Sequence, residues 1–391
     1  MKVSVVGQGY VGLPLAVAAA KAGHDVLGID LELSRIEKLK NGISPIGDLT
    51  DQQIAGVLKS KNYSVSSDFE SIGHAEIVII CVPTPLNSQR KPDFSLLVNA
   101  LTSITKHMNK DVLIINESTV SPGTTRGLIK ETLDKAGIPY ELAYSPERID
   151  PANKEWTVTN TPKLVAGLTP AATERAAAFY KTFVDSVTIG SSPEVVETAK
   201  LLENSFRLVN ISFVNELAQF CAAMGIDVRE VIDAAATKPH GFMPFYPGAG
   251  VGGHCIPVDP SYLVAKAQEV GAPTRFIDLA NDLNQSLPSY FTGVASGILG
   301  GLPGKKILVV GVAYKPEVAD VRETPAETLI HELRAKGAEV SWHDELVQDW
   351  NGEKSVGLSS DFDLAILVNP HSNTNMSALG STRILNTRGG Y

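Results

Sequence analysis

Cys255 stands in a segment whose residue types suit the presentation of a nucleophile. Gly252 and Gly253 precede it closely, and Pro257 and Asp259 follow. Neither a helix nor a strand continues easily through such a segment, so the backbone is expected to form an unusual turn. A thiolate on that turn would be available for covalent chemistry. The alternative is a tight turn around a buried, unreactive cysteine, because free cysteines are often buried.

Lys200 and Asn204 lie four residues apart in a helical pattern that runs from Pro193 to about Ala236. Residues at this spacing share one helix face. If that face lines a cleft, Lys200 can act on a substrate oxygen while Asn204 donates a hydrogen bond to it. In the alternative, Lys200 faces solvent, as most lysines do. So long a helix is also a natural dimerisation element, and we expect a homodimer or a higher homo-oligomer.

A glycine-rich loop near the start of the chain has the pattern of a dinucleotide site. It reads Gly7-Gln8-Gly9-Tyr10-Val11-Gly12 and lies between an apolar strand, residues 3–6, and a helical pattern, residues 13–22. In this setting Gly7 makes the tight turn, Gly9 lets a pyrophosphate approach the helix N-terminus, and Gly12 permits close helix packing. The residues expected to contact the cofactor are Gly7, Gly9, Tyr10, Val11 and Gly12.

Asp30 ends the next strand, residues 25–30, at the distance from the glycine loop expected of a ribose-binding acid. Its carboxylate would accept hydrogen bonds from the adenosine ribose and repel a 2′-phosphate, which favours NAD over NADP. Arg35 lies one helical turn further on and would flank the adenosine. As a lone charge it is equally compatible with solvated surface.

Three further strands, at residues 76–82, 112–116 and 140–144, each end in a polar loop. Ligands bind at the carboxyl ends of strands in parallel sheets, so the loop residues Thr84, Ser118, Thr119 and Glu147 are candidates. The first three would line the nicotinamide side and Glu147 would act as a general base. The alternatives are turn and helix-capping roles for the hydroxyls and a hydrated surface position for Glu147. With short strands at 163–168 and 186–189, the sheet would have about eight strands.

The C-terminal part repeats this logic without the full glycine fingerprint. A strand at residues 305–310 ends in a glycine loop, and strands follow at 339–342, 363–368 and 383–386. The cations at its strand ends and loops are Lys315, Arg322 and Arg388, which could meet a phosphate or a pyrimidine. We therefore expect an α/β protein with two Rossmann-like doubly wound domains joined by a long central helix and a helical middle region. The expected domains are residues 1–195 for NAD, 196–302 for dimerisation with the cysteine loop, and 303–391 for the second ligand.

Composition narrows the classes of partner. The chain has 391 residues and a formal net charge of -9 without a basic tract, which argues against nucleic acid and anionic membranes. Its three cysteines are far apart and lack metal-ligand spacing, so we predict no metal site and a reducing compartment. A strand begins at once and no apolar run could cross a bilayer, so we expect a cytoplasmic protein.

In their order and amino-acid sequence, these motifs resemble those of the UDP-glucose/GDP-mannose dehydrogenase family. Besides the glycine loop and Asp30, the stretches that carry the likeness are Glu117-Ser118-Thr119 with Pro122-Gly123, Ser145 to Arg148, Lys200 to Asn204, Pro247 to Cys255, Asp259, Tyr314-Lys315-Pro316 and Asp320 to Glu323. The sequence from Lys238 to Pro247 is most similar to that of bacterial UDP-N-acetylhexosamine 6-dehydrogenases, the UDP-N-acetylglucosamine type in particular.

The resemblance implies that the C6 alcohol of a UDP-sugar is oxidised to a carboxylate by two NAD in succession. In the first oxidation Lys200 and Asp259 would handle the proton and the developing oxyanion, with Asn204 assisting. The uronic acid produced would supply surface polysaccharide synthesis.

The second oxidation, by the same resemblance, would pass through Cys255. Its thiolate would add to the aldehyde, giving a thiohemiacetal that is oxidised to a thioester. Water positioned by Glu147 and Thr119 would then hydrolyse the thioester.

For the substrate, the resemblance implies that the loop from Phe242 to Gly252 holds the uridine and ribose. Arg322 would reach the cofactor. The residues expected to bind substrate are Glu147, Arg148, Lys200, Asn204, Phe245, Tyr246, Gly248, Gly252, Lys315 and Arg388. His240 departs from the family, because some relatives carry there an arginine thought to reach the sugar of the neighbouring subunit.

Several alternatives stay open at this point. The sugar could be glucose, N-acetylglucosamine, N-acetylgalactosamine or N-acetylmannosamine, so a UDP-glucose 6-dehydrogenase is the first alternative. A two-electron dehydrogenase of the β-hydroxyacid type shares the first domain but has no use for a nucleophilic Cys255. A cofactor-binding sensor that has lost catalysis is a third, because fold alone does not establish function.

Overall fold

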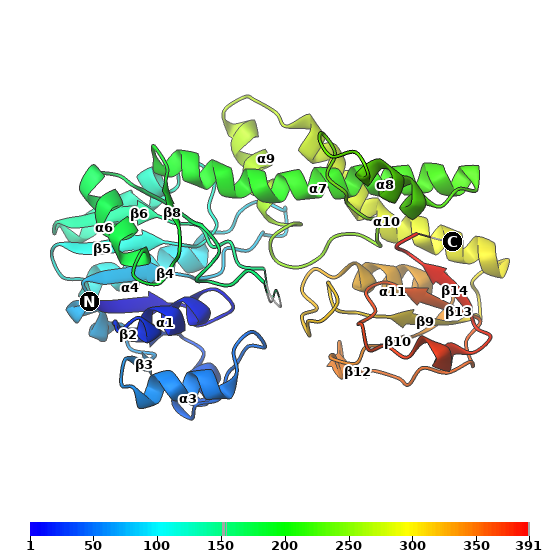
Figure 1. Cartoon of the computed structure of the whole chain (residues 1–391), viewed down its shortest axis with the longest axis horizontal. Coiled ribbons are helices and arrows are strands. Elements are labelled where there is room, and N and C mark those ends of the chain that lie inside the picture. The colour runs from blue at the N-terminus through cyan, green and yellow to red at the C-terminus, as the bar shows by residue number, and fades with distance from the viewer. Residues whose placement is uncertain (151–152, 154, 390–391) are drawn as a thin grey trace. The chain divides into compact units, whose positions relative to one another are not determined.

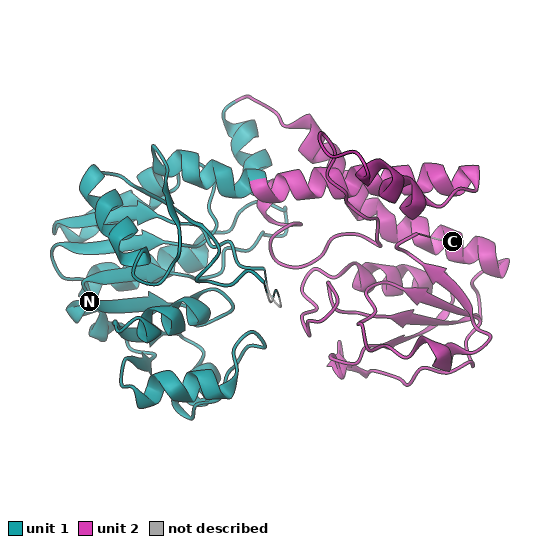
Figure 2. Cartoon of the chain, viewed as in Figure 1, with its two compact units in different colours: residues 1–202, 261–270 teal, residues 203–260, 271–391 magenta. Residues whose placement is uncertain are grey.

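The computed structural model describes every residue except 151–152, 154 and 390–391. The chain divides into two compact units: unit 1 is residues 1–202 and 261–270, and unit 2 is residues 203–260 and 271–391 (Figure 2). Unit 1 contains a mostly parallel sheet and unit 2 a parallel one, both with helices, so the predicted α/β class is confirmed. Among the helices that the structure describes, none is long and apolar enough to cross a membrane.

Unit 1 is built on an eight-stranded sheet in the order β3-β2-β1-β4-β5-β6-β7-β8 (Figure 1). Its strands are β1 (Lys2–Val6), β2 (Asp25–Ile29), β3 (Tyr63–Ser66), β4 (Ile77–Ile80), β5 (Val112–Asn116), β6 (Tyr140–Tyr144), β7 (Lys163–Gly167) and β8 (Val187–Ile189). All neighbours pair in parallel except β6 and β7. The strand order reverses at β1, which places the loops after β1 and β4 side by side where such sheets bind ligands.

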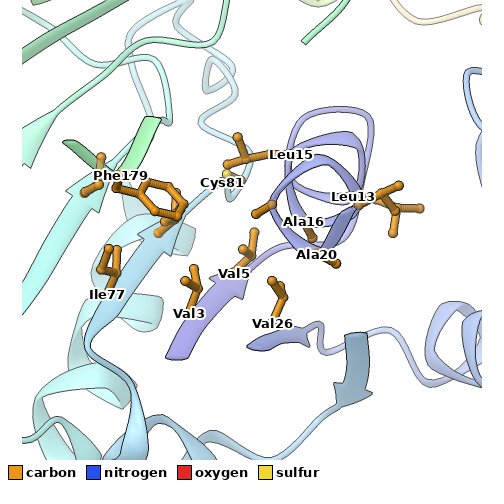
Figure 3. Packing of buried hydrophobic residues seen from close by; sticks show 14 of the residues in the cluster. Val3, Val5, Leu13, Leu15, Ala16, Ala20, Val26, Ile77, Cys81 and Phe179 are labelled. Atoms are coloured by element: carbon orange, nitrogen blue, oxygen red, sulfur yellow. The ribbon is translucent and has the colours of Figure 1, made fainter. Parts of the chain in front are cut away.

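Helices cover both faces of this sheet. They are α1 (Gly12–Lys21), α2 (Leu33–Lys40), α3 (Asp51–Lys59), α4 (Ser95–His107), the short α5 (Lys130–Leu133) and α6 (Pro170–Tyr180). Because side chains alternate along a strand, Val5 of β1 packs with the α1 side of the sheet and Val6 with the α4 side. Figure 3 shows Ala16 and Ala20 of α1 close to Val5 and Val26. Small alanines let α1 approach the sheet closely, which brings the helix N-terminus to the end of β1.

Unit 2 contains a four-stranded parallel sheet in the order β10-β9-β13-β14. Its strands are β9 (Lys306–Val310), β10 (Glu339–His343), β13 (Leu364–Leu367) and β14 (Arg383–Asn386), with a small hairpin of β11 (Asp349–Trp350) and β12 (Glu353–Lys354). Its helices include α8 (Val228–Ala236), α10 (Arg275–Leu299) and α11 (Pro325–Ala335). The main core of the unit joins this sheet to α10 and α11, with the buried Trp342 among its largest side chains.

A long helix, α7 (Pro193–Met224), links the two units, as predicted, but it is shorter than the sequence pattern suggested. The pattern continued to about Ala236, whereas α7 ends before Gly225, which adopts a positive φ of 69°. The Asp227 side chain then caps the separate helix α8 by accepting from the Arg229 backbone N–H. Periodicity alone missed this break because the apolar spacing carries on through it. The helix after the cysteine loop is α9 (Asp259–Glu269).

Candidate active site

The glycine loop between β1 and α1 has the geometry of a dinucleotide site. Gly7 adopts φ +95°, and a Cβ there would lie 2.5 Å from the Cys81 carbonyl oxygen. A Cβ on Gly12 would lie only 1.9 Å from the Gly7 oxygen. At Gly9, in contrast, nothing lies within 4 Å of the Cβ position. Two glycines are therefore required by the fold itself, while the third leaves open space at the helix N-terminus, which fits a pyrophosphate.

Asp30 follows β2 and lies against this loop. Its Oδ2 accepts hydrogen bonds from the Gln8 backbone N–H and from Arg35 Nη1, both at 2.8 Å, and its Oδ1 accepts from the Glu32 backbone N–H at 2.9 Å. Arg35 is thus not a lone surface charge, because it forms an ion pair with Asp30. The carboxylate is fixed beside the glycine loop, where it suits ribose hydroxyls.

The polar residues predicted to line the nicotinamide side do come together. Thr84 Oγ1 donates to the Thr119 main-chain oxygen at 2.8 Å, and Ser118 Oγ donates to the Val82 oxygen at 2.8 Å. The Tyr262 hydroxyl on α9 donates to the Thr84 oxygen. The Thr84 and Ser118 bonds join the loops after β4 and β5, which is neither a turn nor a helix-capping role, and both hydroxyls lie at the predicted edge of the sheet.

Glu147 and Arg148 follow β6. Glu147 is buried, and its Oε1 accepts from the Ile149 backbone N–H, which rules out the hydrated surface position. Arg148 Nη1 donates to the Pro162 oxygen at 2.7 Å. A pocket in unit 1 opens between this loop and α1; its lining residues are Val11, Leu15, Glu117, Arg148, Ile149, Val158, Thr161, Pro162 and Lys163.

A buried charged cluster at this pocket was missed by the sequence analysis. Glu117 Oε2 accepts from Lys163 Nζ at 2.7 Å, and Glu117 Oε1 accepts from the Tyr180 hydroxyl. Burial and the Glu117 carboxylate raise the pKa of Tyr180, which therefore stays protonated and acts as a donor. An acid directly after the apolar strand β5 was the available signal, but its partners lie 46 and 63 residues away in the sequence.

The three cysteines differ in burial, which bears on which thiol can react. Cys81 and Cys221 are buried, whereas Cys255 is half-buried. Burial, reinforced by the Glu117 carboxylate, raises the pKa of the Cys81 thiol and keeps it unreactive. Cys255 is the most accessible of the three.

The turn that carries Cys255 is built as the sequence predicts. Gly253 has φ +83°, and a Cβ there would lie 2.8 Å from the Tyr314 ring. A Cβ on Gly252 would lie 2.6 Å from the Glu323 oxygen. The Gly253 N–H also donates to the Arg322 oxygen at 3.0 Å. Both glycines are required by packing, because the turn lies too close to residues 314–323 to admit a side chain at either position.

Asp259 is fixed at the far side of the same turn. Its backbone N–H donates to the Cys255 main-chain oxygen at 2.8 Å, and its Oδ2 accepts from Asn204 Nδ2 at 2.5 Å. Both side chains are buried, and Lys200, one turn earlier on α7, is only 5 % exposed. The solvent-facing alternative for Lys200 is therefore wrong.

The loop before the cysteine is held by side chains of α7, α8 and α10. The Gly248 N–H donates to Asn215 Oδ1 at 2.9 Å, and Phe245 packs on Phe206 with ring centroids 5.8 Å apart. Tyr246 is 43 % exposed, and its hydroxyl donates to Asp233 Oδ1 at 2.7 Å. The loop is thus anchored while it presents an aromatic ring to solvent.

The predicted cations of the C-terminal sheet have different surroundings. Arg322 forms an ion pair with Asp320 at 2.5 Å, and Lys315 Nζ lies 5.9 Å from the centroid of the Tyr314 ring. Arg388 follows β14, and its Nη2 donates to Asn369 Oδ1 at 2.7 Å. Arg388 is therefore at the carboxyl edge of the sheet, as predicted.

The loop after β9 in unit 2 is closed to a dinucleotide. Asp344 Oδ2 accepts from the backbone N–H groups of Val312 and Ala313, at 2.9 and 3.1 Å. A Cβ on Gly311 would lie 2.1 Å from the Asn369 carbonyl carbon. The chain's own carboxylate takes the amides that a pyrophosphate would need. With Glu345 and His371 this Asp forms a compact acidic cluster, but His371 bonds to Asp344 at 2.9 Å and accepts from the Glu317 N–H, so its atoms are used by the fold.

The predicted site residues fall on both units. Glu147, Thr119 and Lys200 belong to unit 1, while Cys255, Asn204 and Asp259 belong to unit 2. Within unit 2 the structure brings the last three together, because Asp259 bonds both to the Cys255 main chain and to the Asn204 side chain on α7. The roles assigned to all six stay predictions.

Comparison with known proteins gives a consistent result. The chain matches the NAD binding domain (residues 1–184), the central domain (194–286) and the UDP binding domain (308–376) of the UDP-glucose/GDP-mannose dehydrogenase family. It is 36 % identical over 373 residues to a UDP-N-acetyl-D-glucosamine 6-dehydrogenase of Pseudomonas aeruginosa, covering 92 % of this chain and 86 % of that protein. It is 37 % identical over 369 residues to protein CapL of Staphylococcus aureus, covering 91 % and 85 %.

Solved structures agree. The structure of a UDP-D-ManNAc dehydrogenase from Pyrococcus horikoshii matches with a TM-score of 0.92 at 30 % identity, over 99 % of this chain and 95 % of that one. The resemblance inferred from the motifs is thereby confirmed, together with NAD as the cofactor of the first domain. This chain belongs to the UDP-glucose/GDP-mannose dehydrogenase family.

Proposed function

We propose that this protein is an NAD-dependent 6-dehydrogenase that converts a UDP-N-acetylhexosamine to the corresponding uronic acid in two successive two-electron oxidations. The observation that carries the proposal is the Cys255 turn, in which one backbone hydrogen bond joins the thiol-bearing residue to Asp259. The half-buried thiol and a fixed carboxylate thus flank one turn, where a nucleophile and a base could serve the same substrate. The names of the relatives favour an N-acetylhexosamine substrate.

In the first oxidation the protein has to remove the proton of the C6 hydroxyl. NAD, when bound, accepts one hydride in each oxidation. The residues of unit 1 proposed to hold it are Gly7, Gly9, Tyr10, Val11, Gly12, Asp30, Arg35, Thr84, Ser118 and Thr119, and the family resemblance adds Arg322 of unit 2. Asp259 accepts the proton through a water, and the Lys200 ammonium stabilises the developing alkoxide. Asn204 keeps the Asp259 carboxylate oriented by its hydrogen bond.

In the second oxidation the Cys255 thiolate adds to the aldehyde carbon, and the aldehyde oxygen takes up a proton. The resulting thiohemiacetal carries the second hydride and the proton that leave when the thioester forms. Water, deprotonated by Glu147 and positioned with Thr119, then attacks the acyl carbon. The C–S bond breaks, the thiolate leaves, and the uronate is released as a building block for surface polysaccharides.

We also propose a dimer formed along α7. The apolar side chains that this helix exposes in unit 2 are Phe206, Phe213, Phe220 and Met224, at 45, 60, 58 and 63 % exposure. Their spacing of four and seven residues places them in one stripe along the helix. Such a stripe on a long helix is the usual signature of a helix-to-helix contact.

Two further predictions accompany this proposal. The first is a functional division of the chain into three parts. Residues 1–195 would bind the cofactor, residues 196–302 would form the dimer and carry the cysteine loop, and residues 303–391 would bind UDP. We also propose a cytoplasmic location, which the three free thiols favour.

The experiment that tests the proposal counts NADH formed per sugar, with each UDP-sugar limiting and NAD in excess. Two NADH for one N-acetylhexosamine would support it and identify the sugar. Two NADH for UDP-glucose alone would replace the substrate. One NADH per sugar would instead indicate a two-electron dehydrogenase, and none on any sugar would favour a non-catalytic sensor.

A further inference from the structure

In unit 2 the Arg229 side chain reaches the main chain of Arg388, which is distant in the sequence. Arg229, in the first turn of α8, donates from Nη1 to the Arg388 main-chain oxygen at 3.5 Å. Gly389 packs on the same turn, since a Cβ there would lie 3.1 Å from Arg229 Cγ and 3.1 Å from Val228 Cγ1. Gly389, after β14, and the start of α8 are therefore in contact.

The described acids near this pair are engaged elsewhere. Within the part of the chain that the structure describes, no carboxylate lies within ion-pair distance of either guanidinium. Asp233, one turn along α8, accepts from the Tyr246 hydroxyl, and Asp227 caps the helix through the Arg229 backbone N–H. Burial and the neighbouring Arg229 charge lower the pKa of Arg388. Like charges held together in this way create a local demand for an anion.

Arg229 is also linked to the loop that leads to the catalytic turn. Its guanidinium carbon lies 5.2 Å from the centroid of the Tyr246 ring, within the range of a cation–π contact. The same loop is anchored two residues later by the Gly248–Asn215 hydrogen bond. An anion bound at the arginines would thus contact groups that also position this loop.

We propose that Arg229 acts with Arg388 as a two-arginine clamp for the diphosphate of the nucleotide sugar. This inference rests on the proposed function. It adds Arg229, a residue of the matched central domain, to Arg388, which follows the matched UDP binding domain in the sequence. Guanidinium groups suit a diphosphate because their planar donors bond phosphate oxygens in pairs. The two negative charges of the ligand offset the repulsion within the clamp, and the Tyr246 ring lies alongside for the nucleoside.

The test is calorimetric binding of UDP and of uridine, without NAD, to the wild type and to Arg229→Gln. We expect the substitution to weaken UDP about tenfold and to leave uridine unchanged, because only UDP carries the diphosphate. Arg229→Lys should fall between the two, since it keeps the charge and loses the planar fork. Arg275→Gln, which removes an exposed charge at the start of α10, is the matched control and should bind both ligands as the wild type does.

Two results would overturn the clamp: equal weakening of UDP and uridine, which would make Arg229 only a support for Tyr246, or no change for either. A wild type that binds UDP no better than uridine would overturn it as well. Because binding is measured without turnover, the outcome is separate from the NADH count. Selective loss of UDP in Arg229→Gln supports the clamp even if the protein oxidises no sugar.

Discussion

Asn204 Nδ2 donates to Asp259 Oδ2 at 2.5 Å, joining α7 to the first residue of α9. Both side chains are buried, so this bond is exchanged little with water and fixes the carboxylate firmly. The Asp259 backbone in turn bonds to Cys255. One hydrogen-bonded chain therefore runs from the central helix through the carboxylate to the proposed nucleophile.

Asp259→Asn should lower kcat by at least about 100-fold, because the amide cannot accept the proton of the C6 hydroxyl. The side chain keeps its shape and can still accept from Asn204, so the melting temperature should change little. Steady-state kinetics and thermal unfolding check both points. Thr102→Ala is the control, because Thr102 lies exposed on α4 and its hydroxyl donates to the Val98 oxygen of its own helix. Wild-type turnover in Asp259→Asn would remove this residue from the mechanism.

Substitution of two glycines in the same loop should separate folding from cofactor binding. Gly12→Ala places a Cβ 1.9 Å from the Gly7 oxygen and should cost more than about 4 kcal/mol of unfolding free energy. Gly9→Ala meets nothing within 4 Å, so the protein should fold normally and lose NAD affinity, because the methyl group occupies the place of the pyrophosphate. Denaturant unfolding and NAD titration measure the two effects. Normal NAD binding by Gly9→Ala would contradict the assigned position of the cofactor.

The buried Glu117–Lys163 pair should be costly to break from one side. Glu117→Gln leaves the Lys163 ammonium, whose side chain is 11 % exposed, without its carboxylate, and we expect a loss of about 3–5 kcal/mol. The double variant Glu117→Gln with Lys163→Met should recover much of this loss, because no unpaired charge remains. Urea denaturation of Glu117→Gln, Lys163→Met and the double variant gives the coupling free energy between the two side chains. Simple additivity would show that the pair is not a coupled unit.

The three thiols should react in the order of their exposure. Cys255 should be labelled by a thiol reagent in the native protein, while Cys81 and Cys221 should react only after unfolding. Because burial raises the pKa of Cys81, moderate alkalinity should not make its thiol reactive. Peptide mass analysis after labelling identifies the sites, with Cys255→Ser as the blank. Protection of Cys255 by a UDP-sugar would place the substrate near the thiol, whereas rapid native labelling of Cys81 would contradict the burial described here.

Local patterns predicted the parts of this molecule that depend on neighbouring residues. The glycine loop and the Cys255 turn require glycine at particular positions, because a Cβ would clash there or because the backbone has a positive φ. These glycines, and Asp30 at its expected spacing, can be recognised in the sequence. The helix break at Gly225 was hard to predict, because the helical spacing of apolar residues continues across it. The strand β3 (Tyr63–Ser66) was not among the predicted strands, since its alternating polar residues resemble a loop.

Long-range pairs were the part that the sequence could not predict. Asn204 and Asp259 were both candidates, but their hydrogen bond spans 55 residues and depends on where α9 begins. Lys163 is the first residue of an otherwise apolar strand, and no neighbouring residue in the sequence indicates that its ion-pair partner is Glu117. The closing of the loop after β9 by Asp344 likewise needed the folded sheet.

The central claim is that Cys255 becomes covalently acylated during the second oxidation. The most direct measurement is intact-protein and peptide mass spectrometry of Glu147→Gln quenched in acid during turnover with a UDP-N-acetylhexosamine and NAD. Because this variant cannot activate water, we expect a uronyl thioester on the peptide that contains Cys255, and none in the double variant with Cys255→Ser. Production of two NADH per sugar by Cys255→Ser at the wild-type rate, with no acylated peptide in Glu147→Gln, would contradict the account.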